Sequence, residues 1–279
     1  MRDPNGPGWH LDRLRFDAML RDAARGTGAA LVTLDGRARA RREGKVWRVR
    51  DEGSGRDYAA PILVDATGRA AALLRGLGIP RHAADRLICA HALLPPAAGD
   101  GDRCTRVRAD ADGWWYSARV PSGGRVLAFH LDADDPDLRG ARDAAAFLAR
   151  ARRSPPLDDV LPARIDGTTI HMRPAGGAWS DFDACAREPG LYAVGDACLA
   201  FDPLSSQGLF HALASAESAA AAIARRLDGA ADADLPFWTE MRNVRARYQA
   251  ALRDVYARAA RFAGRRFWAR RNGARVRAG

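Results

Sequence analysis

The sequence predicts a mixed α/β fold in which an α/β domain is interrupted by an antiparallel sheet domain and followed by a helical C-terminal tail. Two apolar strand patterns, Tyr58–Val64 and Leu191–Val194, each precede a helical pattern, which is typical of α/β units. Between them, short strand patterns alternate with clusters of Gly, Pro and Asp, as in antiparallel sheets. We therefore assign residues 1–80 and 186–230 to the α/β domain, 81–185 to the inserted sheet domain and 231–279 to a basic helical region.

The α/β segments are expected to contain three helices and several strands, and the C-terminal region a further helix. Asp12 can cap a helix that runs to about Arg25, with Leu14, Ala18 and either Leu20 or Met19 facing inward. We expect strands at Ala29–Leu34, Arg37–Arg42, Val46–Asp51 (with Trp47 and Val49 on one face) and Tyr58–Val64, and a short helix at Arg69–Leu77. A long helix, Ser205–Leu227, follows the Leu191–Val194 strand, and a second covers Leu235–Phe262. The buried face of the long helix is predicted to comprise Leu209, Leu213, Ala216, Ala220, Ile223 and Leu227.

The inserted domain is expected to be an antiparallel sheet covered by one helix. The helix is predicted at about Ala141–Ala151. The predicted strands are Arg86–Leu94, Cys104–Ala109, Trp114–Val120, Arg125–Leu131 and Thr168–Arg173.

Composition excludes several classes of protein. The chain has 279 residues with 47% hydrophobic and 28% charged residues, which suits a folded globular protein. No apolar run has the length of a membrane helix, and the start lacks the apolar core of a secretory signal, so we expect a cytoplasmic protein. The four cysteines form no CxxC pair and no metal-ligand spacing, so no metal site is predicted.

The net charge of +10 is concentrated at the C-terminal end. Between Arg242 and Arg277 there are twelve arginines and one acid, Asp254. Two interpretations stay open: a solvated or domain-packing helix, or a docking site for an acidic protein partner. No groove-reading motif accompanies the arginines, so nucleic-acid recognition is not expected.

The segment from Gly195 to Gly208, GDACLAFDPLSSQG, carries the clearest chemical signal. A buried strand that ends in Gly195-Asp196 places a carboxylate at the carboxyl edge of a sheet, where ligands of α/β folds bind, and Asp196 can accept hydrogen bonds from a polyol. Pro203 suits a helix start, and the amides near Ser206 and Gln207 are expected to point their dipoles at a ligand. Gly208 allows a flat ring to approach the backbone.

This string resembles the second flavin-binding motif of the FAD-dependent aromatic hydroxylases and tryptophan halogenases. The resemblance implies an FAD-binding, Rossmann-like domain in which Asp196 holds the ribityl chain and the Pro203–Gly208 segment faces the flavin ring. Two further strings resemble the same superfamily in the same order. Ile62–Arg69 (ILVDATGR) places Asp65 and Gly68 beneath the cofactor, and the string around Arg13 places that arginine near the middle of the flavin. The likeness covers about residues 8–228 and extends loosely to Arg266–Arg271, which is similar to the tail of flavoproteins that mature quinone-cofactor amine oxidases.

One part of the superfamily pattern has no counterpart. The superfamily opens with a strand, a GxGxxG turn and a helix that bind the ADP half of FAD, and this chain contains no such opening. The FAD-binding domain is therefore expected to be N-terminally incomplete. Either the true start lies upstream, or the chain is a decayed fragment.

The sheet domain offers weaker candidates for substrate chemistry. Trp114 and Tyr116 share one strand face and either line an aromatic-substrate pocket or belong to the sheet core. His130 and His171 lie in predicted strands, either as proton donors and acceptors or as structural histidines. The string Gly113–Pro121 resembles the WxWxIP of halogenases but has two extra residues before the proline, and Lys45, the only lysine, is a poor match for the halogenase lysine. Halogenation is therefore not supported by these residues.

Two functional hypotheses result. The resemblance implies an FAD-dependent oxidoreductase of the monooxygenase type, in which a flavin hydroperoxide hydroxylates an aromatic small molecule or a side chain of a partner protein, with NAD(P)H as a candidate electron donor. The alternative is a truncated, non-catalytic remnant that acts as a binding module through its arginine-rich tail.

Overall fold

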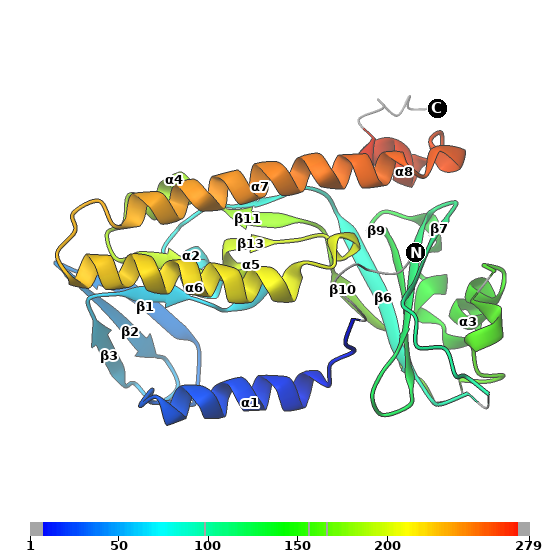
Figure 1. Cartoon of the computed structure of the whole chain (residues 1–279), viewed down its shortest axis with the longest axis horizontal. Coiled ribbons are helices and arrows are strands. Elements are labelled where there is room, and N and C mark those ends of the chain that lie inside the picture. Colours follow the sequence, from blue (N-terminus) through cyan, green and yellow to red (C-terminus); the bar gives the residue numbers. More distant parts are fainter. Residues whose placement is uncertain (1–7, 98, 156, 166, 273–279) are drawn as a thin grey trace. The chain divides into compact units, whose positions relative to one another are not determined.

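The computed structural model describes residues 8–272 except 98, 156 and 166, and the chain forms two compact units (Figure 1). The sheet unit comprises the chain up to Val32, Leu87–Pro174 and the chain from Ala259 onward, and the α/β unit comprises Thr33–Arg86 and Ala175–Arg258. The mixed α/β fold with an inserted antiparallel sheet is confirmed. The insertion begins at Leu87 and ends at Pro174, and not at residues 81 and 185 as expected, because β5 (Arg81–Ala83) and β11 (Ala178–Ser180) pair with each other inside the α/β unit.

Three small sheets supply the strands of the α/β unit. The first is antiparallel, in the order β1-β2-β3, and the second is a parallel pair of β4 and β12. The third is antiparallel, in the order β13-β11-β5. The remaining bounds are β1 Ala38–Glu43, β2 Val46–Asp51, β3 Asp57–Ala60, β4 Leu63–Asp65, β12 Leu191–Ala193 and β13 Leu199–Ala200.

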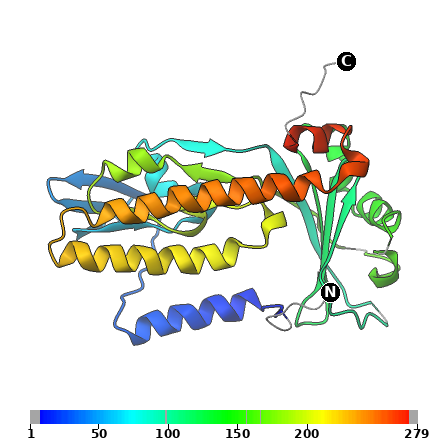
Figure 2. The ribbon, with the colours of Figure 1, turned by 45° about the horizontal axis from the view of Figure 1, so that its top comes forward.

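Helices α6 and α7 lie side by side along the α/β unit in both ribbon views (Figures 1 and 2). Their aromatic and small side chains, among them Trp238, Phe237 and Ala219, enter the same buried core as Tyr192 and Trp47. The helices of this unit are η1 Gly68–Ala70, α2 Ala72–Gly76, α4 Phe182–Ala186, α5 Gly195–Cys198, η5 Pro203–Ser205, α6 Gly208–Leu227 and α7 Asp234–Ala257.

Several expectations for this unit are wrong in detail. Ala29–Leu34 forms no strand and is largely exposed, because no neighbouring strand pairs with it in the described part of the chain. The predicted strand Tyr58–Val64 is split at Pro61, which cannot donate a ladder hydrogen bond, into β3 and β4 of different sheets. The predicted helix Arg69–Leu77 is likewise divided at Ala71, whose φ of 42° is left-handed.

The buried face of α6 also differs from the predicted one. The buried residues are His211, Ser215, Ala219 and Ala222, whereas Leu213 and Leu227 are exposed. The helix has apolar residues on two faces, and hydrophobic periodicity alone does not distinguish the face that meets the core. Small residues on this helix allow it to approach α5 closely, at Gly195.

The sheet unit is built on a five-stranded antiparallel sheet in the order β10-β6-β9-β8-β7. Helix α3 (Ala144–Arg152) covers one face, where Trp115, Phe129 and Phe147 form the centre of the core. The expected strands and covering helix are thus confirmed. The bounds are β6 Leu87–Leu94, β7 Arg106–Asp110, β8 Gly113–Arg119, β9 Arg125–Asp132 and β10 His171–Pro174, with short helices η2 Pro136–Leu138, η3 Gly140–Arg142, η4 Asp158–Val160 and η6 Ala260–Phe262.

Helix α1 (Arg13–Gly26) begins where the sequence predicts, because the Asp12 carboxylate accepts a hydrogen bond from the Arg15 amide. Its expected inward face is not buried. Leu14, Met19 and Leu20 are all exposed, and no residue of the helix is buried. In the part of the chain that the structure describes, nothing packs over this apolar side.

Arginines of the C-terminal region have partners inside the chain. Helix α8 (Arg266–Arg271) is held to the end of β9 by Arg270 and Arg271, each of which bonds to Asp132 at 2.9 Å. Arg265 pairs with Asp112, and in the α/β unit Arg242 pairs with Asp183. These contacts favour the interpretation of the basic region as a packed helical tail over that of a docking surface. Arg275 and Arg277 lie outside the described residues.

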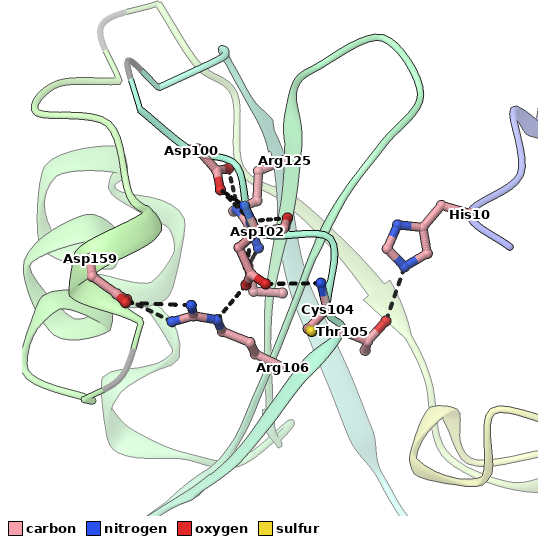
Figure 3. Close-up of polar contacts among 9 residues, drawn as sticks. His10, Asp100, Asp102, Cys104, Thr105, Arg106, Arg125 and Asp159 are labelled. Atoms are coloured by element: carbon pink, nitrogen blue, oxygen red, sulfur yellow. Dashed lines mark hydrogen bonds and ion pairs between the residues drawn. The ribbon is translucent and has the colours of Figure 1, made fainter. Parts of the chain in front are cut away.

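A buried ion pair holds the start of β9 to the loop that precedes β7 (Figure 3). Arg125 is 1% exposed, and its Nε and Nη2 atoms each donate to the Asp100 carboxylate at 2.8 Å. Its Nη1 donates to Ser117 Oγ at 3.1 Å, and Nη2 also donates to the Asp102 carbonyl. The guanidinium lowers the pKa of Asp100, so both charges persist inside the fold.

Among the described helices, none has both the length and the apolarity that crossing a bilayer requires.

We predict that Arg125→Met destabilises the protein by about 3–5 kcal/mol, because the Asp100 charge stays buried without its partner. Urea unfolding followed by circular dichroism measures this change. The matched control, Arg108→Met on β7, removes a half-buried arginine for which no ion pair is present in the described structure, and it should change stability by less than about 1 kcal/mol. Equal losses in the two variants would contradict a special role for the Arg125–Asp100 pair.

Candidate functional site

The turn after β12 places Asp196 at the carboxyl edge of the parallel strand pair. The Val194 amide donates to the Asp65 carbonyl at 3.0 Å, which extends the pairing with β4 to the last residue before the turn. Gly195 then adopts a positive φ of 53°, and a Cβ atom there would lie 3.3 Å from Ala212 Cβ on α6. Its amide donates to Ser215 Oγ at 2.8 Å. A glycine is therefore required both for the turn and for the close approach of α6.

The Asp196 carboxylate combines partial burial with a single ionic partner. Its side chain is one-third exposed (33%), and Oδ2 lies 3.3 Å from Nε of Arg69. Burial raises the pKa of Asp196, and the positive charges of Arg69 and Arg81 oppose that rise. In the described structure this ion pair is the carboxylate's only polar contact, so its remaining lone pairs can accept hydrogen bonds from ligand hydroxyls.

Two arginines that the sequence reasoning did not select organise this turn. Arg69 donates through Nη1 to the Gly176 carbonyl and through Nη2 to the Phe201 carbonyl, both at 2.6 Å. Arg81 donates to the Asp196 and Ala197 carbonyls, at 2.6 and 2.8 Å. Arg69 is the last residue of the ILVDATGR string, and its place in that string was the one sequence feature that could have pointed to a role at the site. Nothing local marks Arg81, because the two carbonyls it bonds to lie more than 100 positions away in the chain.

The ILVDATGR segment places its two predicted residues in different settings. Asp65 is fully buried, and its carboxylate accepts hydrogen bonds from the amide and hydroxyl of Thr67 and from the Leu74 amide. This aspartate therefore shapes the turn and the start of α2, and its oxygens already have internal donors. Gly68 has a positive φ of 68°, and a Cβ atom there would meet open space, so its backbone is accessible.

Two tyrosines of α7 fix the loop from Asp202 to Gly208 through hydrogen bonds to its first residue. Tyr256 Oη donates to the buried Asp202 carboxylate at 2.7 Å, and the Asp202 amide donates to Tyr248 Oη at 2.7 Å. The carboxylate also accepts a hydrogen bond from the Leu204 amide, so Asp202 caps η5, which begins at Pro203. Pro203 thus starts a short 3-10 turn, and the long helix begins at Gly208.

The free amides begin at Gly208, directly after the Ser206 and Gln207 amides that the sequence predicted to be free. The Ser206 amide donates to the Pro203 carbonyl and the Gln207 amide donates to Ser205 Oγ, so neither is available to a ligand. The amides of Gly208, Leu209 and Phe210 have no acceptor within the described residues, and no side chain caps the helix. Ser206 has a left-handed φ of 53°, a strained conformation that turns the chain into this helix start.

These features fit an isoalloxazine ring and its ribityl chain. The uncapped start of a 20-residue helix offers N–H donors and a positive dipole end to an electron-rich ring edge. Gly208 presents open space where a Cβ would be, and the Asp196 turn contacts α6 at Ala212, one helical turn further on. A carboxylate that can accept hydrogen bonds from hydroxyls is therefore carried by a turn that packs against the same helix whose first amides are free.

The remaining predicted site residues lie in the sheet unit. Arg13 is exposed on the first turn of α1, where it pairs with Asp17 at 3.3 Å. Trp114 and Tyr116 share the sheet face opposite α3, as predicted, since Trp114 pairs with His130 and Tyr116 with Ala128 in the ladder. Arg13 is thus held in a different unit from Asp196.

His130 and His171 have different surroundings on that face. The His130 ring stacks on Trp114 with ring centroids 3.6 Å apart, and burial lowers the pKa of His130 to about 3, so the ring stays neutral at pH 7. His171 is exposed, and its ring lies 5.6 Å from that of His91, which the sequence reasoning did not select. The side chains of Trp114 and His130 are buried, whereas those of Tyr116, His91 and His171 are at least partly exposed to solvent.

We predict that Gly195→Ala destabilises the protein by about 1–3 kcal/mol, since alanine is strained at positive φ and its Cβ would press on Ala212. Thermal and urea unfolding measure the loss. Gly208→Ala is the matched control, because Gly208 is helical and a methyl group there meets open space; this change should be neutral or slightly stabilising. An unchanged stability of the Gly195→Ala protein would show that the turn tolerates a side chain.

Comparison with known proteins identifies relatives that are flavoenzymes. The chain is 26% identical over 273 residues to LodB of Marinomonas mediterranea, described as an FAD-dependent oxidoreductase, with 96% of this chain and 72% of that protein aligned. Among solved structures it is similar to QhpG, a peptidyl tryptophan dihydroxylase essential for tryptophylquinone cofactor biogenesis, with 30% identity and a TM-score of 0.73. The flavin-dependent halogenase CmlS shares the fold, with 21% identity and a TM-score of 0.74.

The chain covers only part of these structures. It aligns over 96% of its own length with QhpG and 94% with CmlS, but spans 61% and 49% of those chains. A family model, that of the tryptophan halogenases, matches residues 3–275 of this chain. The chain therefore belongs to the tryptophan halogenase family.

Proposed function

We propose that this chain forms the flavin-binding and substrate-facing part of an FAD-dependent oxidoreductase of the monooxygenase type. The observation that carries the proposal is the pairing of Asp196, a half-buried carboxylate with unused acceptor capacity, with the uncapped start of α6. Membership in the tryptophan halogenase family and the similarity to FAD-dependent LodB support the same cofactor.

The residues of the α/β unit divide into those that contact the flavin and those that hold the contacts in place. Asp196 accepts hydrogen bonds from the ribityl hydroxyls, and the amides of Gly208, Leu209 and Phe210 face the electron-rich edge of the ring. Gly68 lets the cofactor lie close to the backbone. Asp65 and Ser215 act behind these groups by fixing the two turns. The bound flavin supplies the electrons and the oxygen activation, with NAD(P)H as the proposed electron donor.

The proposed substrate is an aromatic side chain carried by a partner protein. The 30% identity to QhpG, which acts on a peptidyl tryptophan, supports this class over a free small molecule. On this chain the accessible groups of the sheet face, Tyr116, His91 and His171, provide an aromatic surface and two polar rings that suit an indole. A small aromatic molecule is the second candidate, because the structural neighbours include halogenases such as CmlS.

Hydroxylation is favoured over halogenation. Lys45, the only lysine, lies in the exposed turn between β1 and β2, where it projects into solvent from a hairpin of the α/β unit. The tryptophan-containing strand β8 also lacks the halogenase spacing before its proline. We therefore propose that oxygen, and not a halogen, is transferred to the substrate.

We predict that Asp196→Asn weakens FAD binding about tenfold, because a carboxylate forms stronger hydrogen bonds to hydroxyls than an amide does. Titration followed by quenching of flavin fluorescence measures the dissociation constant. Asp228→Asn, an isosteric change at the exposed C-terminal cap of α6, is the control and should leave affinity unchanged. A wild-type protein that does not respond to FAD would overturn the proposed function.

A second prediction concerns the reaction. With FAD, NAD(P)H, oxygen and chloride all present, a tryptophan-containing peptide should gain oxygen atoms and no chlorine, as read by mass spectrometry. Tyr116→Ala should lower the yield through a higher KM, since it removes an aromatic contact and no group of the flavin site. Chlorinated peptide as the main product would refute the preference for hydroxylation.

A further inference from the structure

Arg69 joins four segments of the α/β unit at one guanidinium group. The arginine follows the β4 turn, and its Nε lies 3.3 Å from Asp196 Oδ2. Its two terminal nitrogens donate at 2.6 Å to carbonyls of two further segments, Gly176 before β11 and Phe201 before the Asp202–Gly208 loop. All the segments that form the proposed flavin site, except α6, are thus in direct contact with this side chain.

The geometry requires an arginine. A guanidinium is planar and presents donors in fixed directions, so two carbonyls and one carboxylate can be held at the same time. A lysine in the same place has a single nitrogen and reaches one or two of the three acceptors. The two carbonyl contacts also fix the plane of the group, so that the guanidinium stays within ion-pair distance of Asp196.

We propose that Arg69 is a positioning residue for flavin binding, which holds the Asp196 carboxylate at a set distance from the Phe201–Gly208 segment. This inference rests on the proposed function, because it assigns Asp196 to the ribityl chain. Arg69 acts through Asp196 and through the loop, and its Nη1 and Nη2 atoms each donate to a backbone carbonyl of the chain.

The electrostatics of the pair give a readout that a purely structural role would not produce. The charged groups that face Asp196 are Arg69 from η1 and Arg81 from β5. Burial raises the pKa of Asp196 and the two arginines oppose this rise. Without the Arg69 charge, Asp196 takes up a proton at higher pH, and a protonated carboxyl accepts hydrogen bonds from hydroxyls more weakly.

The test is a titration of the full chain with riboflavin, which contains the ring and the ribityl chain, at a series of pH values. Arg69→Met should weaken binding roughly tenfold to hundredfold near neutral pH, in line with the loss of charge-assisted contacts. When the pH is lowered, the affinity of this variant for riboflavin should also begin to fall at a higher pH than that of the wild type. We call this fall in affinity at low pH the acid side of the profile. Arg69→Lys should keep the acid side near its wild-type position, because the positive charge remains. It should still bind riboflavin more weakly than wild type, because a lysine cannot donate to both carbonyls as the planar guanidinium does.

Arg75→Met is the matched control, since it removes an exposed guanidinium from the neighbouring helix α2. It should reproduce wild-type affinity and pH profile. If Arg69→Met and Arg69→Lys both bind like the control, or if Arg69→Met weakens binding with no movement of the acid side, the inference is overturned. A wild-type chain that binds neither riboflavin nor FAD refutes the proposed function itself, which separates the two failures. Thermal melts of each variant confirm that folded protein is compared, and Arg69→Lys carries the test if Arg69→Met does not fold.

Discussion

The close contact between the Gly195 turn and helix α6 is the constraint on which the site depends. Because Gly195 has a positive φ and packs against Ala212, β12 ends directly beside the first turns of the helix. Ser215 accepts the Gly195 amide and so closes the contact with a buried hydrogen bond. This arrangement packs the turn that carries the Asp196 carboxylate against a helix whose first amides have no internal acceptor in the described chain.

Buried polar groups hold the loops around this contact in one conformation. Asp65 and Asp202 are both buried, and each carboxylate is satisfied by backbone amides and a hydroxyl of its own surroundings. Arg69 and Arg81 tie backbone carbonyls of distant segments to the same place. Since a buried polar group without a partner is costly, these bonds make alternative loop conformations unfavourable. The flavin-facing groups are thereby preorganised by residues that need not touch the flavin.

The sheet unit shows the same principle at both ends of β9. Arg125 joins the start of the strand to Asp100, and Arg270 and Arg271 join its end, through Asp132, to helix α8. Much of the positive charge of the C-terminal region is therefore compensated inside the fold. On the sheet face opposite α3, the stacked side chains of His130 and Trp114 are buried. The side chains of Tyr116 and His171 on the same face are accessible to solvent.

Local signals predict the antiparallel sheet, its covering helix, the strand before Gly195 and the candidate Asp196. These signals are alternation of apolar residues, turn residues and a glycine–aspartate strand end. Packing between distant segments sets three other features: the buried face of α6, the unpaired state of Ala29–Leu34, and the start of the free amides at Gly208. Arg69 and Arg81 also became apparent only in the fold, because the carbonyls they bond to lie more than 100 residues away in the chain. Such contacts depend on which segments meet in space, and neither periodicity nor propensity contains that information.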